Sequence, residues 1–375
     1  MKKVLLIAPM SSVHERFNIA NFSALEANGF EVSVIANFSL CDHDKQYKKE
    51  FENKGIELFD LPFQRASLLK NLKLIPEIKR IIKNGGFDIV HAHTETGGIL
   101  VRLSVSADKN AAYFYTPHGM SFYKGSSLKS QLIYRPIERF ICGKMAKVFC
   151  INEEEYKTVK AWKKGNEVFV HGIGLDLDSV INAENKDEEI IKEFGITEDT
   201  KVILSVGELN DNKDHATCIK ALSKLNTDTT YIVCGEGDKR EELIQLADRL
   251  GVKLVLTGYR YDVKSFYRIA DIFVFPSHHE GLAVSMLEAM AAGLPIVCSR
   301  IRGNTDIIID GEGGYLCETE DAEAFANGIE AYLRDETKRR WSGEINRKKA
   351  EQYSLAFVTE ELKGKYGEKA NEQTL

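Results

Sequence analysis

The segment 276–295 (PSHHEGLAVSMLEAMAAGLP) carries the residue types of an anion-binding loop. An apolar run ends at Pro276, and a helical pattern begins near Ala283. The free N–H groups and the positive dipole end of such a helix suit a diphosphate, and Gly281 lets the ligand approach the backbone closely. We therefore predict that this segment binds a diphosphate.

Two carboxylates flank the predicted start of that helix. Glu280 and Glu288 are eight residues apart in the sequence. On one helix they would lie ~12 Å apart, beyond the ~5–9.5 Å of a glycosidase carboxylate pair. We interpret them as contacts to different parts of one elongated ligand. The alternative is that Glu280 is only a charge at a helix N-terminus and Glu288 a solvated one.

A second glycine-containing loop follows another apolar run, in residues 205–215 (SVGELNDNKDH). It contains Gly207, and Lys213 is placed to supply a cation to the same diphosphate; a solvent-facing lysine is the alternative. The glycine turn 234–238 (CGEGD), with Gly235, follows a third run and is expected to shape the base or ribose site. It is not the G-x-G-x-x-G pattern of dinucleotide-binding folds.

Histidines follow two apolar runs in the first half, within 91–98 (HAHTETGG) and 116–125 (TPHGMSFYKG). His91 and His93 alternate along a strand, so we interpret them as hydrogen-bonded core residues, with metal binding as the alternative. His118 lies in a Pro–His–Gly turn at a strand end, where a polar group faces a ligand.

The segment 10–16 (MSSVHER) is expected to be a loop after the first strand. It contains no glycine, which argues against a Rossmann-type phosphate site there.

Apolar runs alternate with amphipathic stretches along the whole chain. We predict strands near 3–8, 31–36, 56–59, 88–92, 111–116, 147–151, 167–171, 201–206, 229–234, 253–257, 272–275 and 295–298. We predict helices near 16–28, 71–84, 97–107, 128–145, 153–161, 214–225, 238–250, 262–269, 283–292, 321–333 and 355–367. Continuous rather than alternating apolar strands are typical of parallel sheets covered by helices on both faces.

The pattern restarts at Lys201 and therefore predicts two doubly wound, Rossmann-like α/β domains facing a cleft. We expect domains at 1–178 and 179–354, and a final helix and tail at 355–375 that packs back on the first domain. Ligands bind such sheets at the carboxyl ends of the strands, so each wall of the cleft would hold one ligand.

Composition excludes several classes of protein. The 375 residues are 43% hydrophobic and 28% charged, as in an ordinary globular protein. No apolar run reaches the ~20 residues of a membrane helix, and we interpret MKKVLLIAPM as a buried strand rather than a signal peptide. The seven cysteines form no C-x-x-C pair, which favours free thiols in a reducing cytosol. A sequence pI near 5.9 argues against a nucleic-acid partner.

Charge is distributed unevenly between the two halves. Residues 1–175 hold 25 Lys and Arg against 18 Asp and Glu, whereas residues 176–375 hold 25 against 38. The segment 121–147 contains one acid, Glu138. Its basic residues are Lys124, Lys129, Arg135, Arg139, Lys144 and Lys147, and its aromatic ones are Phe122, Tyr123, Tyr134 and Phe140. We predict that this face docks on an anionic membrane leaflet; a solvated helix packed on its own sheet is the alternative.

The motifs together resemble the retaining glycosyltransferases of family four, which have the GT-B fold of two Rossmann-like domains around a cleft. The Glu280–Glu288 element within HEGLAVSMLEAMAAGLPIV carries the resemblance, with INEEEYKTVKAW (151–162), HGIGLDLD (171–178) and IRGNTDIIIDGEGGYL (301–316). Within this family, the chain resembles in particular the EpsD-like enzymes of capsule and exopolysaccharide synthesis.

The resemblance implies a role for each matching residue. Glu280 would hold hydroxyls of the donor sugar, and Gly281 and Leu282 would offer N–H groups to the donor phosphates. Glu288 would bind the ribose, and Lys213 would neutralise the leaving diphosphate. The donor-binding set is Gly207, Lys213, Gly235, Arg260, Glu280, Gly281, Leu282 and Glu288. The acceptor-side set is Ser12, His14, His118, Tyr123 and Lys124, with His118 beside the reacting sugar.

Two departures from the family pattern stand out. Where members commonly read Gly-Arg-Leu, this chain has Glu208 in the middle position, so Arg260 or Arg302 would have to replace the missing arginine. The Gly-Gly turn common after the first strand is also absent, which puts the acceptor contacts of that loop in doubt.

The resemblance implies a metal-independent transfer of a sugar from a UDP-sugar to a lipid-linked saccharide, with retention and without a cofactor. Negative charge grows on the leaving diphosphate while the sugar becomes oxocarbenium-like, so stabilising the diphosphate is the main electrostatic task. The alternatives are a nucleotide-sugar epimerase and an inactive nucleotide-sugar-binding subunit of a partner transferase. The predicted location is cytoplasmic, at the inner face of the cell membrane.

Overall fold

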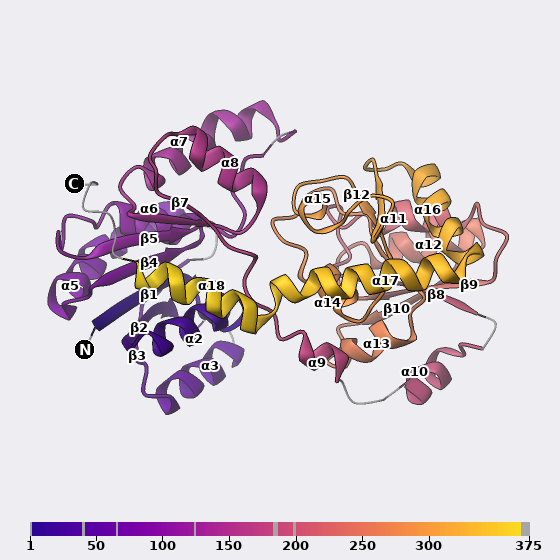
Figure 1. The fold of residues 1–375 in the computed structure, drawn as a ribbon, viewed down its shortest axis with the longest axis horizontal. Helices are drawn as coiled ribbons and strands as arrows, with labels where there is room; N and C mark the ends of the chain where they lie inside the picture. The colour runs from indigo at the N-terminus through magenta and orange to yellow at the C-terminus, as the bar shows by residue number, and fades with distance from the viewer. Residues whose placement is uncertain are drawn as a thin grey trace. The chain divides into compact units, whose positions relative to one another are not determined.

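The computed structural model describes residues 2–39, 42–64, 67–123, 125–182, 187–197 and 200–368. The chain divides into two compact units. Unit 1 comprises Met1–Gly174 and Leu355–Leu375, and unit 2 comprises Leu175–Ser354. Figure 1 shows unit 1 mainly in indigo and magenta, with a yellow helix, and unit 2 mainly in pink and orange.

Unit 1 is built on a seven-stranded sheet in the order β3-β2-β1-β4-β5-β6-β7. Its strands are β1 (Lys2–Met10), β2 (Phe30–Asn37), β3 (Glu57–Asp60), β4 (Ile89–His93), β5 (Ala112–Thr116), β6 (Lys147–Cys150) and β7 (Glu167–Phe169). All of these ladders are parallel. The direction of winding reverses between β1 and β4, so the loops after these strands border the crevice where such sheets bind ligands.

Helices cover both faces of this sheet. They are α1 (Ser11–Phe17), α2 (Ile19–Ala27), α3 (Asp42–Asn53), α4 (Leu68–Asn71), α5 (Ile75–Gly85), α6 (Thr94–Arg102), α7 (Leu128–Cys142), α8 (Glu153–Ala161) and α18 (Leu355–Gly367), with a 3-10 turn at Leu72–Leu74. Successive residues of β1 enter opposite cores because side chains alternate along a strand. Leu5 and Ile7 pack toward α5 and α6, whereas Val4 and Leu6 pack toward α2 and α18.

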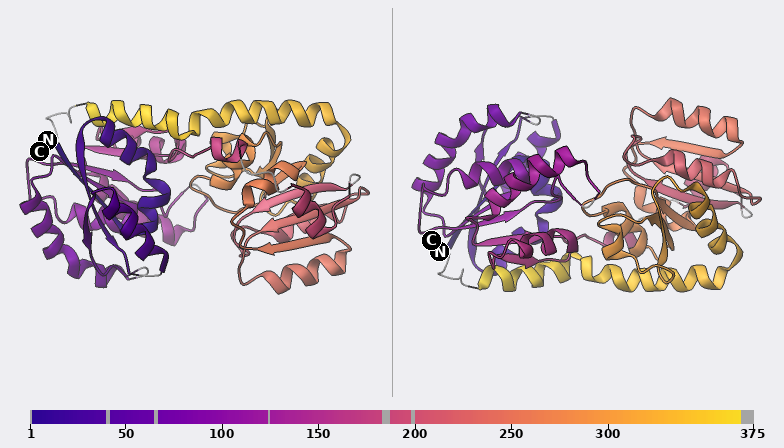
Figure 2. Two further views of the ribbon diagram at one scale, coloured as in Figure 1. Left: turned by 90° about the horizontal axis from the view of Figure 1, so that it is seen from below. Right: turned by 90° about the horizontal axis from the view of Figure 1, so that it is seen from above.

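The C-terminal helix α18 belongs to unit 1. Val358, Leu362 and Tyr366 lie in the same core as Ala20 and Ala24 of α2, and both helices lie on one side of this unit in Figures 1 and 2. The final helix therefore packs on the first sheet, as predicted.

Unit 2 repeats the architecture with a six-stranded sheet in the order β10-β9-β8-β11-β12-β13. Its strands are β8 (Lys201–Val206), β9 (Thr229–Cys234), β10 (Lys253–Gly258), β11 (Ile272–Phe275), β12 (Ile296–Ser299) and β13 (Gly314–Cys317). The ladders are again parallel. The winding reverses between β8 and β11. The prediction of two doubly wound α/β domains is confirmed.

Helices cover both faces of this second sheet as well (Figure 2). They are α9 (Asp178–Ile181), α10 (Asp187–Phe194), α11 (His215–Leu222), α12 (Arg240–Leu250), α13 (Val263–Ile269), α14 (Val284–Ala291), α15 (Asn304–Ile307), α16 (Ala322–Arg334) and α17 (Glu336–Ala350), with a 3-10 turn at Glu351–Tyr353. Val202 and Leu204 face the core of α13 and α14, whereas Ile203 faces that of α11, α12 and α16.

The structure corrects the prediction at several elements. The segment expected to be a loop after the first strand is mostly helix α1. The predictions missed α3, α9, α10, α15, α17 and β13 altogether. Helix α17 buries Ser342, Gly343 and Asn346 in place of large apolar residues. A Cβ atom on Gly343 would lie 2.0 Å from the Gly293 carbonyl oxygen, so close backbone packing replaces an apolar stripe.

Two expectations from composition can be compared with the described residues. The expected strand at the start of the chain is β1, with six consecutive buried residues. Six of the seven cysteines lie in the described part and have free, buried thiols, whereas Cys41 lies outside it. In that same part of the chain, no helix has both the length and the apolar character needed to cross a membrane.

Candidate active site

The candidate donor site of unit 2 lies at its topological switch point. β8 and β11 are neighbours in the sheet, with Ile203 opposite Ile272, and the chain leaves them in different directions. Lys213 lies on the loop after β8, and Glu280 lies on the loop after β11. Because both strands end at the same edge of the sheet, the fold brings the two predicted loops together.

Hydrogen bonds between the two loops hold them in one arrangement. The His278 backbone N–H donates to the Asn212 carbonyl at 2.8 Å, and the Asn212 side chain donates back to the His279 carbonyl at 3.1 Å. Within the first loop, the Lys213 N–H donates to Asn210 Oδ1 at 3.0 Å. The loops therefore position Lys213 as a single unit.

Lys213 and Glu280 form a close ion pair. Lys213 Nζ lies 2.6 Å from Glu280 Oε1, and the two side chains are 20% and 13% exposed. The ammonium also lies 4.7 Å from the centre of the Phe275 ring, within cation–π range. A charge-assisted bond between largely buried groups is stronger and more directional than a surface pair. Lys213 is therefore not the solvent-facing lysine of the alternative interpretation.

Close backbone packing explains the glycines beside this pair. A Cβ atom on Gly235 would lie 1.9 Å from the Gly207 carbonyl oxygen, so only glycine fits there. A Cβ atom on Gly207 would lie 3.2 Å from Cε of Lys213, so a side chain would crowd the lysine stem. The turn after β9 and the loop after β8 thus form one surface with Lys213 beside it.

Helix α14 supplies the second part of the predicted site. Its N-cap, Ala283, makes no side-chain capping hydrogen bond, and Gly281 and Leu282 directly precede it. Glu288 lies on the helix and accepts a hydrogen bond from the Tyr267 hydroxyl at 2.8 Å. Burial raises the pKa of Glu288, while Tyr267 and the Lys264 cation oppose the shift. Glu288 is therefore a half-buried, oriented carboxyl and not a solvated one.

Arg302 contacts the loop that carries Glu280. Its guanidinium is buried and lies 2.7 Å from His279 Nε2, and its Nε–H donates to the Glu280 carbonyl at 3.4 Å. Burial, and then the Arg302 charge, lowers the pKa of His279 to about 4, so this imidazole is neutral. Of the two arginines considered as replacements for the missing one, Arg302 is the one that touches the Glu280 loop.

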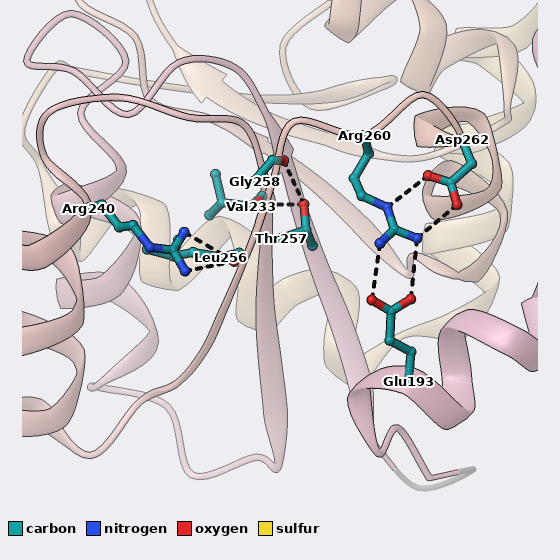
Figure 3. A network of polar contacts seen from close by, with 8 residues as sticks. All are labelled: Glu193, Val233, Arg240, Leu256, Thr257, Gly258, Arg260 and Asp262. Carbon is teal, nitrogen blue, oxygen red and sulfur yellow. Dashed lines mark hydrogen bonds and ion pairs between the residues drawn. The ribbon is translucent and has the colours of Figure 1, made fainter.

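Arg260 is held by two carboxylates of its own (Figure 3). Its guanidinium donates to Asp262 at 2.8 Å from both Nε and one terminal nitrogen, and to Glu193 at 3.0 and 3.2 Å. These hydrogen bonds, Asp262 first, raise the pKa of Arg260. The arginine ties α10 to the loop after β10, and its role in donor binding stays a prediction.

In unit 1, histidines gather at the ends of β4 and β5. The His91 ring is bonded on both sides, by the Tyr366 hydroxyl at 2.7 Å and by Thr116 Oγ1 at 2.9 Å. It is therefore a hydrogen-bonded core histidine, as expected. Among the described residues, no group of three or more His, Cys, Asp or Glu is arranged to hold a metal ion.

His93 and His118 contact one another directly. His93 Nδ1 lies 3.0 Å from His118 Nε2, and the rings stack with centroids 5.2 Å apart. His118 has a φ of 59°, a left-handed conformation that is strained for a residue with a Cβ atom. Burial lowers the pKa of His118 to about 3 and holds that of His93 well below its usual range. Both rings are neutral near pH 7.

The other predicted acceptor-side residues lie in different surroundings. His14 is fully buried on α1, where its ring contacts Asn18 at 3.0 Å and the Ile35 carbonyl at 3.3 Å. Ser12 on the same helix and Tyr123 after β5 are half-buried. Lys124 lies outside the described residues. Acceptor contacts by these four residues stay a prediction.

The basic segment around α7 is more apolar at its surface than the sequence indicated. Exposed side chains on and just after this helix form what we term the α7 surface: Leu128, Lys129, Leu132, Ile133, Arg135, Arg139, Phe140 and Lys144. Leu128 and Leu132 are 82% and 77% exposed.

Three residues of the predicted basic face are buried instead. Phe122 lies in the core, and Lys147 is held by the Lys365 carbonyl and Glu368. Glu138 accepts from the Tyr115 hydroxyl at 3.0 Å, and burial raises its pKa to about 8. Its carboxyl therefore adds no negative charge to the α7 surface at neutral pH.

Sequence reasoning did not identify several residues that the structure places in these sites. Tyr267 lies in no predicted motif, and Asn212 lies in the predicted loop 205–215 without a role assigned to it, because each acts through a partner on another element. The link between His93 and His118 had a partial signal, since the sequence placed both residues near the carboxyl ends of predicted strands.

Both halves of the chain match family models. Residues 15–179 match the model "Glycosyltransferase Family 4", and residues 186–349 match "Glycosyl transferases group 1". The protein named "Putative glycosyltransferase EpsD" in Bacillus subtilis (strain 168) is 31% identical over 372 residues, covering 96% of this chain and 95% of its own.

Two further proteins extend the comparison. The UDP-Gal:alpha-D-GlcNAc-diphosphoundecaprenol alpha-1,3-galactosyltransferase of Escherichia coli is 24% identical, covering 96% of this chain and 95% of its own. The crystal structure of Anabaena Alr3699/HepE in complex with UDP has the same fold, with a TM-score of 0.79 at 17% identity, covering 98% of this chain and 99% of its own. The chain therefore belongs to glycosyltransferase family 4 and is a glycosyltransferase.

Proposed function

We propose that the chain transfers a sugar from a UDP-sugar, with retention, to a hydroxyl of a lipid-linked saccharide in bacterial capsule, exopolysaccharide or surface glycan synthesis. The observation that carries the proposal is the buried Lys213–Glu280 pair at the switch point of unit 2. The name of the Escherichia coli relative, with its UDP-Gal donor and diphosphoundecaprenol acceptor, supports the substrate classes. The UDP-bound HepE structure supports the nucleotide.

In the proposed reaction, unit 2 stabilises the departing diphosphate. Lys213 offers an ammonium that is already partly desolvated, and the N–H groups at the start of α14 add the positive end of a helix. Both are in place before the bond breaks, so little reorganisation accompanies the growth of charge. These groups and Arg302 would serve the diphosphate without a metal ion.

The two carboxylates have different proposed partners. Glu280, held at one oxygen by Lys213, would accept hydrogen bonds from hydroxyls of the transferred sugar. Glu288, oriented by Tyr267, would bind the ribose of the nucleotide. Partial burial would make both carboxylates discriminate between ligands, because a ligand that leaves a buried polar group without a hydrogen-bond partner binds less favourably.

On the acceptor side, we propose that His118 lies beside the reacting sugar. No carboxylate is assigned as a nucleophile, so the acceptor hydroxyl would attack from the face that the diphosphate leaves. A diphosphate oxygen would then take up the proton of the hydroxyl. This front-face route yields retention.

The α7 surface is the proposed contact with the membrane that holds the acceptor. Its four basic residues would each add about 1 kcal/mol at an anionic leaflet, and its exposed leucines would enter the interface. This would place the enzyme at the cytoplasmic face of the cell membrane. Co-sedimentation with anionic and neutral vesicles tests the idea, and equal binding to both would contradict it.

The function is tested by incubating the protein with labelled UDP-Glc, UDP-Gal, UDP-GlcNAc or UDP-GalNAc and a lipid-linked saccharide. We expect transfer from one donor to the acceptor, with an axial anomeric linkage in the product by NMR. Conversion of the donor sugar without acceptor would instead identify an epimerase. Binding without conversion of any donor would identify a nucleotide-sugar-binding subunit.

A further inference from the structure

Two ring nitrogens in the histidine cluster of unit 1 have no hydrogen-bond partner among the described residues. They are His93 Nε2 and His118 Nδ1, and both atoms are buried. The other nitrogens of these rings face each other at 3.0 Å. A neutral imidazole carries one hydrogen, so one ring must donate across this contact and the other must accept.

The surrounding network determines the tautomer of the neighbouring His91. Tyr366 has a single hydroxyl hydrogen, which it donates to Asn21 Oδ1 at 2.6 Å. The 2.7 Å contact between Tyr366 and His91 therefore requires a hydrogen on His91 Nδ1. His91 Nε2 then accepts from the Thr116 hydroxyl at 2.9 Å.

The same reasoning determines the tautomer of His14. Asn21 Nδ2 donates to Asn18 Oδ1 at 3.3 Å, so Asn18 presents its Nδ2 to His14 Nδ1 at 3.0 Å. His14 Nε2 therefore carries the hydrogen and donates to the Ile35 carbonyl at 3.3 Å. Only the His93–His118 contact is left with two tautomeric arrangements.

We propose that His93 is a positioning residue that donates its Nδ1–H to His118 Nε2, so that His118 presents its own Nδ1–H as a neutral hydrogen-bond donor. In this arrangement the unpartnered hydrogen lies on His118, and His93 Nε2 keeps only a lone pair. The opposite arrangement would leave a bare N–H on His93, which is fully buried between the His91 and His14 rings.

Two observations favour the proposed direction. Buried N–H groups without a partner are rarer in proteins than unsatisfied acceptors, so the hydrogen belongs on the ring that borders free space. His118 is half-buried and lines a small cavity with Phe17, Thr116 and Ile151, whereas His93 does not line this cavity. The left-handed backbone of His118 also indicates that its ring is held in place at some local cost.

The consequence for the reaction rests on the proposed function. A neutral Nδ1–H on His118 would donate to an oxygen of the sugar or acceptor and would not act as a base. No net proton transfer is involved, since the hydrogen stays on His118. The hydrogen bond between the two histidines itself does not depend on the identity of the substrates.

The tautomer is tested directly by 15N NMR of protein labelled at histidine, with the His118 signals assigned by their loss in His118→Asn. We expect the protonated Nδ1 pattern for His118 in the unmodified protein. A protonated Nε2 on His118 would overturn the proposal. His171→Gln, which alters a ring bonded to Glu361 in the same unit, is the matched control and should leave the His118 signals unchanged.

Variants of His93 separate positioning from folding. His93→Asn keeps a hydrogen-bond donor near the position of Nδ1, so the His118 tautomer should be retained and kcat should stay within about threefold. His93→Leu removes the donor, so the His118 tautomer should change and kcat should fall about 10–100-fold, with KM for the donor sugar little changed. Equal activity of the two variants, with normal thermal unfolding, would contradict the role. Absence of turnover with every donor would refute the proposed function and leave the NMR test intact.

Discussion

The two units share one architecture and carry opposite chemistry at the ends of their central strands. Unit 2 places a paired ammonium and carboxylate, a second, half-buried carboxyl and an arginine around the β8–β11 switch point. Unit 1 places neutral, hydrogen-bonded imidazoles at the ends of β4 and β5. The sheet thus determines where a site lies, and the side chains on its loops determine which ligand it suits. Charges suit a leaving diphosphate, whereas neutral donors suit uncharged hydroxyls.

The largest difference between the units should be their stability in acid. Folded His14 and His118 titrate near pH 4 and 3, whereas in the unfolded chain they titrate near 6.5. Between these values the unfolded chain binds more protons than the folded one. The free energy of unfolding is therefore greatest above about pH 7 and decreases as the pH falls. From pH 7 to 5 we expect each of these histidines to lower the free energy of unfolding of unit 1 by about 2 kcal/mol, and Glu138, whose pKa is raised to about 8 in the fold, to offset part of the loss.

Each unit holds one tryptophan, which allows the units to be monitored separately. Trp341→Phe leaves Trp162 as the reporter of unit 1, and Trp162→Phe leaves Trp341 for unit 2. Urea unfolding followed by fluorescence at pH 7 and 5 should show the greater loss in unit 1. Unit 2 should lose less, because burial lowers the pKa of two of its histidines, His215 and His279. In unit 1 it lowers the pKa of four: His14, His91, His93 and His118. Equal losses of unfolding free energy in the two units would contradict the predicted difference.

Lys213→Ala should have the largest effect on catalysis. It removes a partly desolvated charge from the proposed diphosphate site and leaves Glu280 without its ion-pair partner. We expect kcat/KM to fall about 10²–10³-fold, measured with the preferred UDP-sugar. Lys220→Ala, an exposed lysine on the adjoining helix α11, is the matched control. An unchanged kcat/KM in Lys213→Ala would remove the assignment.

Glu280→Gln should weaken the same site by a smaller amount, about 10–100-fold in kcat, because the amide keeps the shape and loses the charge. The double variant with Lys213→Ala sharpens the comparison. Since the two groups touch, their effects should fall well short of additivity in a double-mutant cycle. Additive losses would mean that the pair does not act as a unit.

The smallest effect concerns the surfaces of the two units. Lys129→Gln on the α7 surface should weaken binding to anionic vesicles about fivefold, corresponding to about 1 kcal/mol, and the difference should shrink as salt is raised. Arg340→Gln, on exposed helix α17 of unit 2, should leave vesicle binding unchanged. Similar losses in both variants would show that the contact is not confined to unit 1.

Apolar periodicity and loop composition predicted much of this protein. All twelve predicted strands are present, and the Lys213 and Glu280 loops follow β8 and β11 as expected. The strands were predictable because a strand buried on both faces is a continuous apolar run. Strand β13 was missed because its four residues include Gly314. Helix α17 was missed because its buried face is small and polar.

The tertiary structure decided which predicted groups meet. Lys147 is basic in the sequence yet buried against α18, and Arg260 pairs with Glu193 on a different helix. His93 reaches His118 only because β4 and β5 are adjacent in the sheet. Sequence by itself determined the class of fold, the two loops and the family, since these depend on local patterns. Contacts between residues distant in sequence exist only once the sheets have formed. The same is true of the burial that shifts their pKa values.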